Sequence, residues 1–211
     1  MRTNVYVDGF NLYYGSVRGT AFKWLNPMAL AQRVLPRGYT INRIRYFTAY
    51  ITPRPEDPAQ LTRQVTFLRA LRTIPSLSIH LGQFTTHIVS MRLANPGPND
   101  PVKVRVVKTS EKGSDVNLAS YLLFDGFKGD YECALVVSND SDLAEPIRLV
   151  TSELLLPVWV LNPEPRRSKA SGALRDVATC YRRIRRSMLA ASQFPETMRD
   201  AKGTFRKPSR W

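Results

Sequence analysis

Residues 131–138 read YECALVVS, and this stretch decides the fold class. A near-continuous apolar run of this length is typical of a strand in a sheet that is covered on both faces. The alternation of strand-like and helical patterns along the chain predicts a layered α/β fold with a central, mostly parallel sheet. The strand-like runs are residues 4–7, 43–48, 77–84, 133–138 and 157–161, and the helical patterns are residues 27–35, 58–72, 114–127 and 142–152.

Two regions interrupt this alternation. Residues 84–108 contain two strand-like runs around the turn-rich sequence NPGPNDP, which predicts a small β excursion from the sheet. After residue 162, a connector rich in proline and charge leads to an expected helix at 173–189 and to an extended or loosely ordered tail. We therefore expect one α/β domain at residues 1–162 and a basic C-terminal helix and tail at residues 163–211.

The protein is strongly basic, with 31 Lys and Arg against 17 Asp and Glu and a net charge of +14. Residues 166–211 hold 13 basic and 3 acidic side chains, so most of the excess lies there. Concentrated positive charge is expected of a protein that binds a polyanion such as nucleic acid, the alternative being a solubilising tail. The sequence has no apolar run near the roughly 20 residues that span a bilayer and no signal-peptide pattern, and its two cysteines suggest no disulfide framework. We expect a cytoplasmic protein without a membrane partner.

Four aspartates lie where the predicted strands end or the predicted helices begin. Asp8 follows the first strand, Asp115 lies in the first turn of the helix at 114–127, and Asp140 and Asp142 lie in the loop after the strand at 133–138. Because the carboxyl ends of parallel strands share one edge of a sheet, we expect these carboxylates to meet there. Crowded carboxylates favour a bound cation, and an all-oxygen ligand set favours Mg²⁺ or Mn²⁺. Such a cation can activate water and neutralise charge on a phosphoryl group.

Each of these residues also has a local interpretation. Asp8 can cap the turn that follows its strand, and Asn11 can cap a short helix, orient Asp8 or touch a phosphate. Asp115 can interact with the helix macrodipole, which is worth ~0.3–1 kcal/mol. Asp142 can cap its helix as part of a capping box. Of the neighbouring acidic residues, Glu111 is expected to be solvated.

Two blocks of the sequence, YVDGFNLYYG (6–15) and EKGSDVNLASYLLFDGFKGDYECALVVSNDSDL (111–143), resemble the NYN domain, a branch of the PIN-like nuclease superfamily. The resemblance covers roughly residues 3–161. It implies a three-layer α/β/α sandwich and a divalent-metal site that cleaves RNA. Many members carry glycine before the first loop aspartate, where this chain has Asn139, a residue that tolerates unusual backbone conformations. The residues that the resemblance marks as catalytic are Asp8, Asn11, Asp115, Asp140 and Asp142.

The leading interpretation is a metal-dependent endoribonuclease acting on single-stranded or loop RNA. Asp8, Asp115 and Asp140 would bind Mg²⁺ or Mn²⁺, and Asp142 would assist directly or through water. A haloacid-dehalogenase-type phosphatase is disfavoured, because Phe10 stands where that chemistry needs a second aspartate. The alternative is a non-catalytic RNA-binding or assembly module that retains the pocket, and a homo-oligomer or a protein partner stays open.

The residues expected to contact RNA are Lys112, Arg182, Arg185 and Arg186. The three arginines would share one face of the expected C-terminal helix, because positions three and four apart are neighbours on a helix. Tyr13 and Tyr14 either stack on a base or pack in the core.

Overall fold

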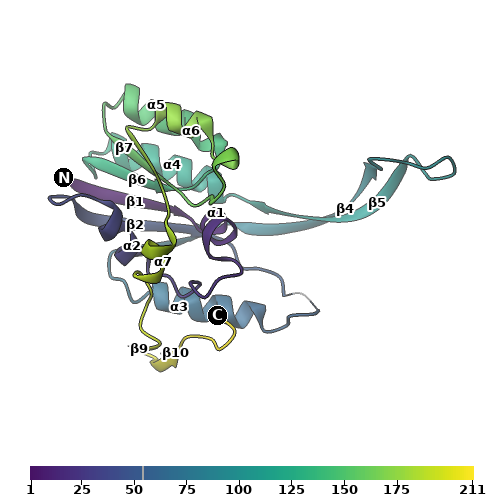
Figure 1. The fold of residues 1–211 in the computed structure, drawn as a ribbon, viewed down its shortest axis with the longest axis horizontal. Coiled ribbons are helices and arrows are strands. Elements are labelled where there is room, and N and C mark those ends of the chain that lie inside the picture. Colours follow the sequence, from purple (N-terminus) through teal and green to yellow (C-terminus); the bar gives the residue numbers. More distant parts are fainter. Residues whose placement is uncertain (54) are drawn as a thin grey trace.

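The computed structural model describes residues 1–53 and 55–211 and confirms the α/β class (Figure 1). Its central sheet has six strands in the order β3-β2-β1-β6-β7-β8, and all five neighbouring pairs are parallel. Parallel strands need long crossover connections, which the helices between them supply. The strands are β1 (Arg2–Asp8), β2 (Thr40–Thr48), β3 (Leu77–Leu81), β6 (Cys133–Val137), β7 (Val158–Asn162) and β8 (Cys180–Arg183).

Helices cover both faces of the sheet, as the near-continuous apolar strands predict. Side chains of β1 alternate between the two layers: Val5 and Val7 join one hydrophobic cluster and Tyr6 joins the other. The three-layer α/β/α architecture is therefore confirmed. One layer contains α4 (Ser114–Phe127), α5 (Ala144–Ser152) and α6 (Gly172–Val177), and the opposite layer contains α2 (Pro27–Val34), α3 (Gln60–Leu71) and α7 (Arg186–Ala190).

Short helical turns lie in the connections between these elements. They are α1 (Gly9–Leu12), the π-helical turn η1 (Tyr13–Val17), and the 3₁₀ turns η2 (Ser141–Leu143) and η3 (Arg167–Lys169). No helix within residues 1–53 and 55–211 is long and apolar enough to cross a membrane.

The β excursion is a long antiparallel hairpin that projects from the body of the protein (Figure 1). It consists of β4 (Gln83–Arg92) and β5 (Lys103–Lys112), which pair along their whole length. The strand expected at 77–84 is divided at Gly82, where a Cβ atom would lie 2.6 Å from the carbonyl oxygen of Lys112. Only glycine allows the backbone of residue 82 to pass this close to that of Lys112. β4 leaves the sheet at this point, and the base of the hairpin lies beside the start of α4.

The C-terminal segment differs from the prediction of one helix at 173–189. It forms α6, then β8, then α7, and β8 extends the sheet as a parallel partner of β7. The Arg182 guanidinium lies over the ring of Trp159 at 4.7 Å and donates a hydrogen bond to the carbonyl oxygen of Val34 at 2.9 Å. Pairing with an otherwise open sheet edge thus outweighs the helical pattern of this segment.

The tail is also more ordered than the sequence predicts. It contains the small hairpin of β9 (Thr197–Asp200) and β10 (Gly203–Arg206). Its aromatic residues surround the fully buried Trp24: the ring centroids of Phe194, Phe205 and Trp211 lie 5.8, 6.4 and 6.1 Å from that of Trp24. Of the two expectations for the tail, extended or loosely ordered, the β9–β10 hairpin agrees with the extended one. The aromatic rings order the tail because they complete the hydrophobic layer that also contains α2 and α3.

Candidate active site

Asp8 lies at the carboxyl end of β1 and is almost completely buried, with 4 % of its surface exposed. Its Oδ1 accepts a hydrogen bond from the backbone N–H of Asn11 at 2.8 Å, and its Oδ2 accepts one from the Ser138 hydroxyl at 2.9 Å. The carboxylate therefore caps α1, as its local interpretation predicts. It is also fixed against the end of β6, which lies beside β1 in the sheet.

Gly9 allows this arrangement. A Cβ atom at this position would lie 2.7 Å from the carbonyl oxygen of Phe47 and 2.7 Å from Cε1 of Tyr46. The turn after Asp8 therefore packs directly against β2, where only glycine fits. This close approach holds the Asp8 carboxylate at the edge of the sheet.

The loop after β6 is joined to the loop after β1 by side-chain hydrogen bonds. The Ser138 hydroxyl, while donating to Asp8, accepts from the backbone N–H of Asp140 at 3.1 Å. The Asn11 side-chain oxygen accepts from the backbone N–H of Asn139 at 3.0 Å. Asn11 is therefore a residue that positions the loop, and it lies inside α1 rather than capping a helix.

Asp140, not Asp142, caps the short helix that follows this loop. The Asp140 Oδ1 accepts from the backbone N–H of Asp142 at 3.0 Å, whereas α5 starts without a side-chain cap. The capping box expected with Glu145 is absent from the described residues, because that side chain pairs with Arg148 instead. Asp142 is exposed on η2.

Asp115 lies in the first turn of α4. The start of this helix is capped by Glu111, whose Oε1 accepts from the backbone N–H of Ser114 at 3.2 Å and from its hydroxyl at 2.8 Å. The Asp115 carboxylate makes no hydrogen bond or ion pair with any described residue, so it remains available to a ligand.

A hollow of about 270 Å³, which we call the carboxylate pocket, brings most of these groups together. The prediction that three distant segments meet at one sheet edge agrees with its lining. Asp142 does not line the pocket, and Glu111, which sequence reasoning treated as solvated, does. The lining residues are Asp8, Phe10, Asn11, Tyr14, Phe84, Glu111, Asp115 and Asp140.

The carboxylates of the pocket perturb one another. The pKa of Asp8 is raised to about 6 in total: burial is the largest cause, the charges of Asp115 and Asp140 add to it, and hydrogen bonds from Asn11 and Ser138 oppose it. Burial also raises the pKa of Asp115, with added contributions from the charges of Asp140 and nearby acidic groups. Like charges held this close favour a positive partner.

The donor set of the pocket fits a hard divalent cation, because every candidate ligand is a carboxylate or amide oxygen. In the described part of the chain, however, no three His, Cys, Asp or Glu side chains converge as a ready-made metal site. Asp8 and Asp140 direct oxygens toward the hydrogen bonds described above. The identity of the ligands therefore remains a prediction.

The basic residues expected to contact RNA occupy different surroundings. Lys112 is exposed at the end of β5 and does not line the carboxylate pocket. Arg182 lies on β8, Arg185 precedes α7, and Arg186 lies over the ring of Phe22 at 5.2 Å. The expectation that the three arginines share one helix face is wrong, because β8 and α7 replace that helix.

An open hollow of about 1,050 Å³, the cationic hollow, contains two of these arginines. Its lining includes Arg175, Arg182, Arg183 and Arg185. The sequence assigns Arg183 to binding only as part of the basic segment, and it does not single out Arg175. The only feature of the sequence that points to these two residues is the high arginine content of the C-terminal segment.

Asn139 connects the cationic hollow with the loop of the carboxylate pocket. Its side chain donates to the carbonyl oxygen of Lys169 at 2.9 Å and accepts from the backbone N–H of Ser171 at 2.8 Å, and Ala170 between them lines the cationic hollow. Leu155 is the one non-glycine residue with positive φ in the described ranges, so Asn139 has an ordinary backbone and acts through its side chain. Glycine here could not make these bonds.

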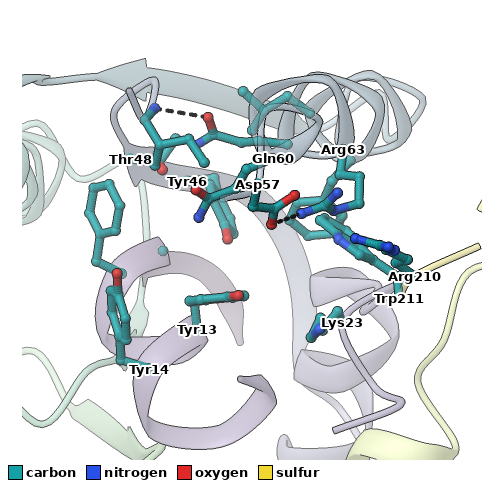
Figure 2. Close-up of a pocket in the computed structure, with 16 residues that line it drawn as sticks. Tyr13, Tyr14, Lys23, Tyr46, Thr48, Asp57, Gln60, Arg63, Arg210 and Trp211 are labelled. Carbon is teal, nitrogen blue, oxygen red and sulfur yellow. Dashed lines mark hydrogen bonds and ion pairs between the residues drawn. The ribbon is translucent and has the colours of Figure 1, made fainter. Parts of the chain in front are cut away.

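A third hollow, the aromatic cavity, measures about 260 Å³ and adjoins the carboxylate pocket. Figure 2 shows the residues that line it. Tyr13 and Tyr14, for which the sequence left base stacking or core packing open, both line it. Phe10 and Tyr14 line the aromatic cavity and the carboxylate pocket alike.

Comparisons with known proteins agree with this fold. The family model of the NYN domain matches residues 2–184 of the chain. A curated relative, 6-hydroxy-3-succinoylpyridine 3-monooxygenase HspA of Pseudomonas putida (strain DSM 28022 / S16), is 28% identical over 238 residues, which cover 100% of this chain and 75% of that protein. The crystal structure of VPA0982 from Vibrio parahaemolyticus, described as a protein of unknown function, matches with a TM-score of 0.55 at 16% identity, covering 88% of this chain and 93% of that one. At this identity the structural match shows the fold alone.

Proposed function

Because the chain belongs to the NYN domain family, and so to the PIN-like nuclease superfamily, we propose that it is a metal-dependent endoribonuclease. The observation that carries the proposal is the carboxylate pocket, in which Asp8, Asp115 and Asp140 reach one edge of the sheet from three segments. Carboxylates gathered at the carboxyl ends of parallel strands are typical of a catalytic site in this class of fold.

In the proposed reaction, water adds to the phosphorus of an RNA phosphodiester and the bond from phosphorus to the leaving ribose oxygen breaks. One phosphate monoester and one hydroxyl result. Mg²⁺ or Mn²⁺, held by Asp8, Asp115 and Asp140, would supply charge stabilisation at the phosphoryl group and lower the pKa of water. Asp142, exposed nearby, would act only through water.

The residues of the chain would do the positioning. Asn11 and Ser138 hold the Asp8 carboxylate and the loop that carries Asp140 in fixed relation. The cationic hollow would hold the RNA backbone, because arginines bind phosphate oxygens strongly. Its connection to the loop through Asn139 would keep the bound strand in register with the pocket.

The test is cleavage of a single-stranded RNA by the purified protein with Mg²⁺, with Mn²⁺ and with EDTA. We expect cleavage with either cation, none with EDTA, and loss of most activity in Asp140→Asn. The matched control is Asp176→Asn, which changes an exposed carboxylate on α6 outside the pocket and should leave activity unchanged. Equal activity of wild type and Asp140→Asn would refute the proposal. RNA binding without cleavage would favour the non-catalytic module instead.

A second candidate function is oxygenation of a small aromatic compound. Two observations favour it: the 28% identity to a protein named as a monooxygenase over the whole chain, and the aromatic cavity beside the carboxylates. Such a reaction would bond one atom of O₂ to a ring carbon and reduce the other atom to water with two electrons and two protons, the electrons coming from an added reductant for which NADH serves as the probe. The test is incubation of the protein with 6-hydroxy-3-succinoylpyridine, ¹⁸O₂ and NADH, followed by mass spectrometry of the products. A product enriched in one atom of labelled oxygen would favour this function over the first.

A further inference from the structure

The aromatic cavity has walls that suit a planar ring. It lies between the start of η1, strand β2 and helix α3 (Figure 2). The rings of Tyr13 and Tyr14 meet at 83° with centroids 5.2 Å apart, and those of Phe67 and Trp211 meet at 57° with centroids 5.4 Å apart. Aromatic surfaces at several inclinations can offer both faces and edges to a planar ligand, and stacking on such surfaces is how proteins bind unpaired bases.

Polar groups in the cavity match the edge of a base. Asp57 pairs with Arg63 through Oδ2, but its Oδ1 is buried and has no hydrogen-bond partner among the described residues. That atom is closed to solvent, but Asp57 lines the cavity with 32% of its side chain exposed, so its carboxylate can accept a hydrogen bond from a ligand N–H. Nucleobases carry such N–H groups on their edges.

Two cations complete the lining. Lys23 and Arg210 border the cavity (Figure 2), and neither forms an ion pair with any acidic side chain of the described ranges. Their charges act on the nearby Asp57 carboxylate without forming an ion pair with it. Both can also bind a phosphate, so the cavity combines a place for a planar ring with a place for a phosphate.

The cavity and the carboxylate pocket are contiguous. Gly9, which directly follows Asp8, lines the aromatic cavity, and Phe10 and Tyr14 line both hollows. We propose that the aromatic cavity receives the base of the nucleotide that adjoins the phosphate to be cut. This inference rests on the proposed ribonuclease function for its substrate. It predicts a requirement for unpaired RNA, because a base that is stacked and paired in a duplex cannot enter the cavity.

The first experiment uses free nucleotides and needs no cleavage. AMP and UMP are titrated into the protein in EDTA while tryptophan fluorescence is followed, since Trp211 lines the cavity. We expect both nucleotides to change the fluorescence and ribose 5-phosphate, which lacks a base, to leave it unchanged. The change should be lost in Trp211→Phe. No response to either nucleotide, or an equal response to ribose 5-phosphate, would overturn the proposal.

The second experiment locates the base in RNA. A short single-stranded RNA is bound in EDTA, with each nucleotide in turn replaced by an abasic one. In wild type, one position should lose roughly 5- to 150-fold in affinity, the range expected for one base stacked on aromatic side chains. In Tyr14→Ala, abasic substitution at the same position should reduce RNA affinity only slightly. The control is Phe127→Ala, which removes an aromatic ring that is 83% exposed at the end of α4 and should reproduce the wild-type pattern.

The outcomes separate this inference from the function on which it rests. If the nucleotides and the abasic position behave as expected but RNA is not cut, the base site stands and the nuclease assignment fails. If RNA is cut but all abasic positions lose affinity equally in wild type and Tyr14→Ala, the base site is wrong and the nuclease assignment stands. Binding of 6-hydroxy-3-succinoylpyridine, titrated in the same way, without binding of either nucleotide would also overturn the base site.

Discussion

Replacing Asp8 with asparagine should stabilise the protein at neutral pH in the absence of metal. The Asp8 carboxylate is buried, and its pKa rises from 3.8 to about 6 on folding. A group whose pKa is raised by folding contributes stability at low pH and loses that contribution as the pH rises through the folded value. Asparagine keeps an oxygen to accept from the N–H of Asn11, so the variant removes the charge and preserves the cap.

The magnitude follows from the shift. A pKa difference of roughly 2 corresponds to ~3 kcal/mol when the group is fully ionised in both states. Ionisation of Asp8 therefore lowers the free energy of unfolding by ~3 kcal/mol at pH 8, by roughly half of that at pH 5, and by close to zero at pH 3. For a chain of this size, 3 kcal/mol corresponds to roughly 6–12 °C in Tm.

The assay is thermal unfolding of wild type and Asp8→Asn from pH 4 to pH 8 in EDTA, then with Mn²⁺. We expect the variant to gain in Tm over wild type as the pH rises, and Mn²⁺ to stabilise wild type alone, because a ligand that binds only the folded state raises stability. The control is Asp200→Asn. Asp200 pairs with Arg69 at 2.6 Å, which lowers its pKa, so that variant should lose stability at neutral pH and approach wild type in acid. An Asp8→Asn protein that is less stable than wild type at pH 8 would refute the reasoning.

Three further predictions follow from the geometry of the site. Gly9→Ala should destabilise the protein by about 1–3 kcal/mol in denaturant unfolding, because the added Cβ would overlap β2; an unchanged midpoint would contradict this close approach. Asp142→Asn should retain most RNA cleavage, since its carboxylate does not line the carboxylate pocket, and a loss as large as that of Asp140→Asn would argue for direct ligation. Arg185→Gln should reduce the slope of log affinity for RNA against log salt concentration by about one unit, because Arg185 lines the cationic hollow. The control is Arg186→Gln, which changes an arginine stacked on a ring outside the hollow and should leave this slope unchanged.

The central elements of the fold could be predicted from the sequence because their patterns are strong and local. The strand at 133–138 and the helix at 114–127 appear as β6 and α4 with nearly the expected limits. The end of a parallel strand is a reliable place to expect a functional side chain, and Asp8 and Asp140 lie where this rule puts them.

The C-terminal segment could not be predicted in the same way, because its pattern fits two structures. The sequence CYRRIRR (180–186) suits a helix with a basic face, and nothing within it excludes a short strand. The open edge of β7 and the ring of Trp159 select the strand, and neither is visible from the segment itself. The division between residues 162 and 163 stays a prediction, and the sheet continues across it through β8.

Two site residues were misjudged for related reasons. Glu111 appears solvated when read with its neighbours alone, but it caps the start of α4 three residues further on, and its pairing with Phe84 of β4 places it in the lining of the carboxylate pocket. Asp140 and Asp142 are two residues apart in one loop, and the direction of η2 decides which of them lines the pocket. The capping bonds of Glu111 and Asp140 are local, but which of these carboxylates line the pocket depends on segments distant in sequence meeting there, which local patterns do not contain.

The position of β1 has a consequence for synthesis of the chain. β1 lies in the middle of the sheet, between β2 and β6, and Asp8 and Ser138 are 130 residues apart in sequence. At a ribosome speed of about 5–20 residues per second, β1 must wait roughly 7–26 s for its second partner. During that time the nascent half-sheet of β1, β2 and β3 exposes an apolar, unpaired strand edge that can pair with another chain. Recombinant expression should therefore yield more folded protein when chaperones that shield nascent strands are abundant.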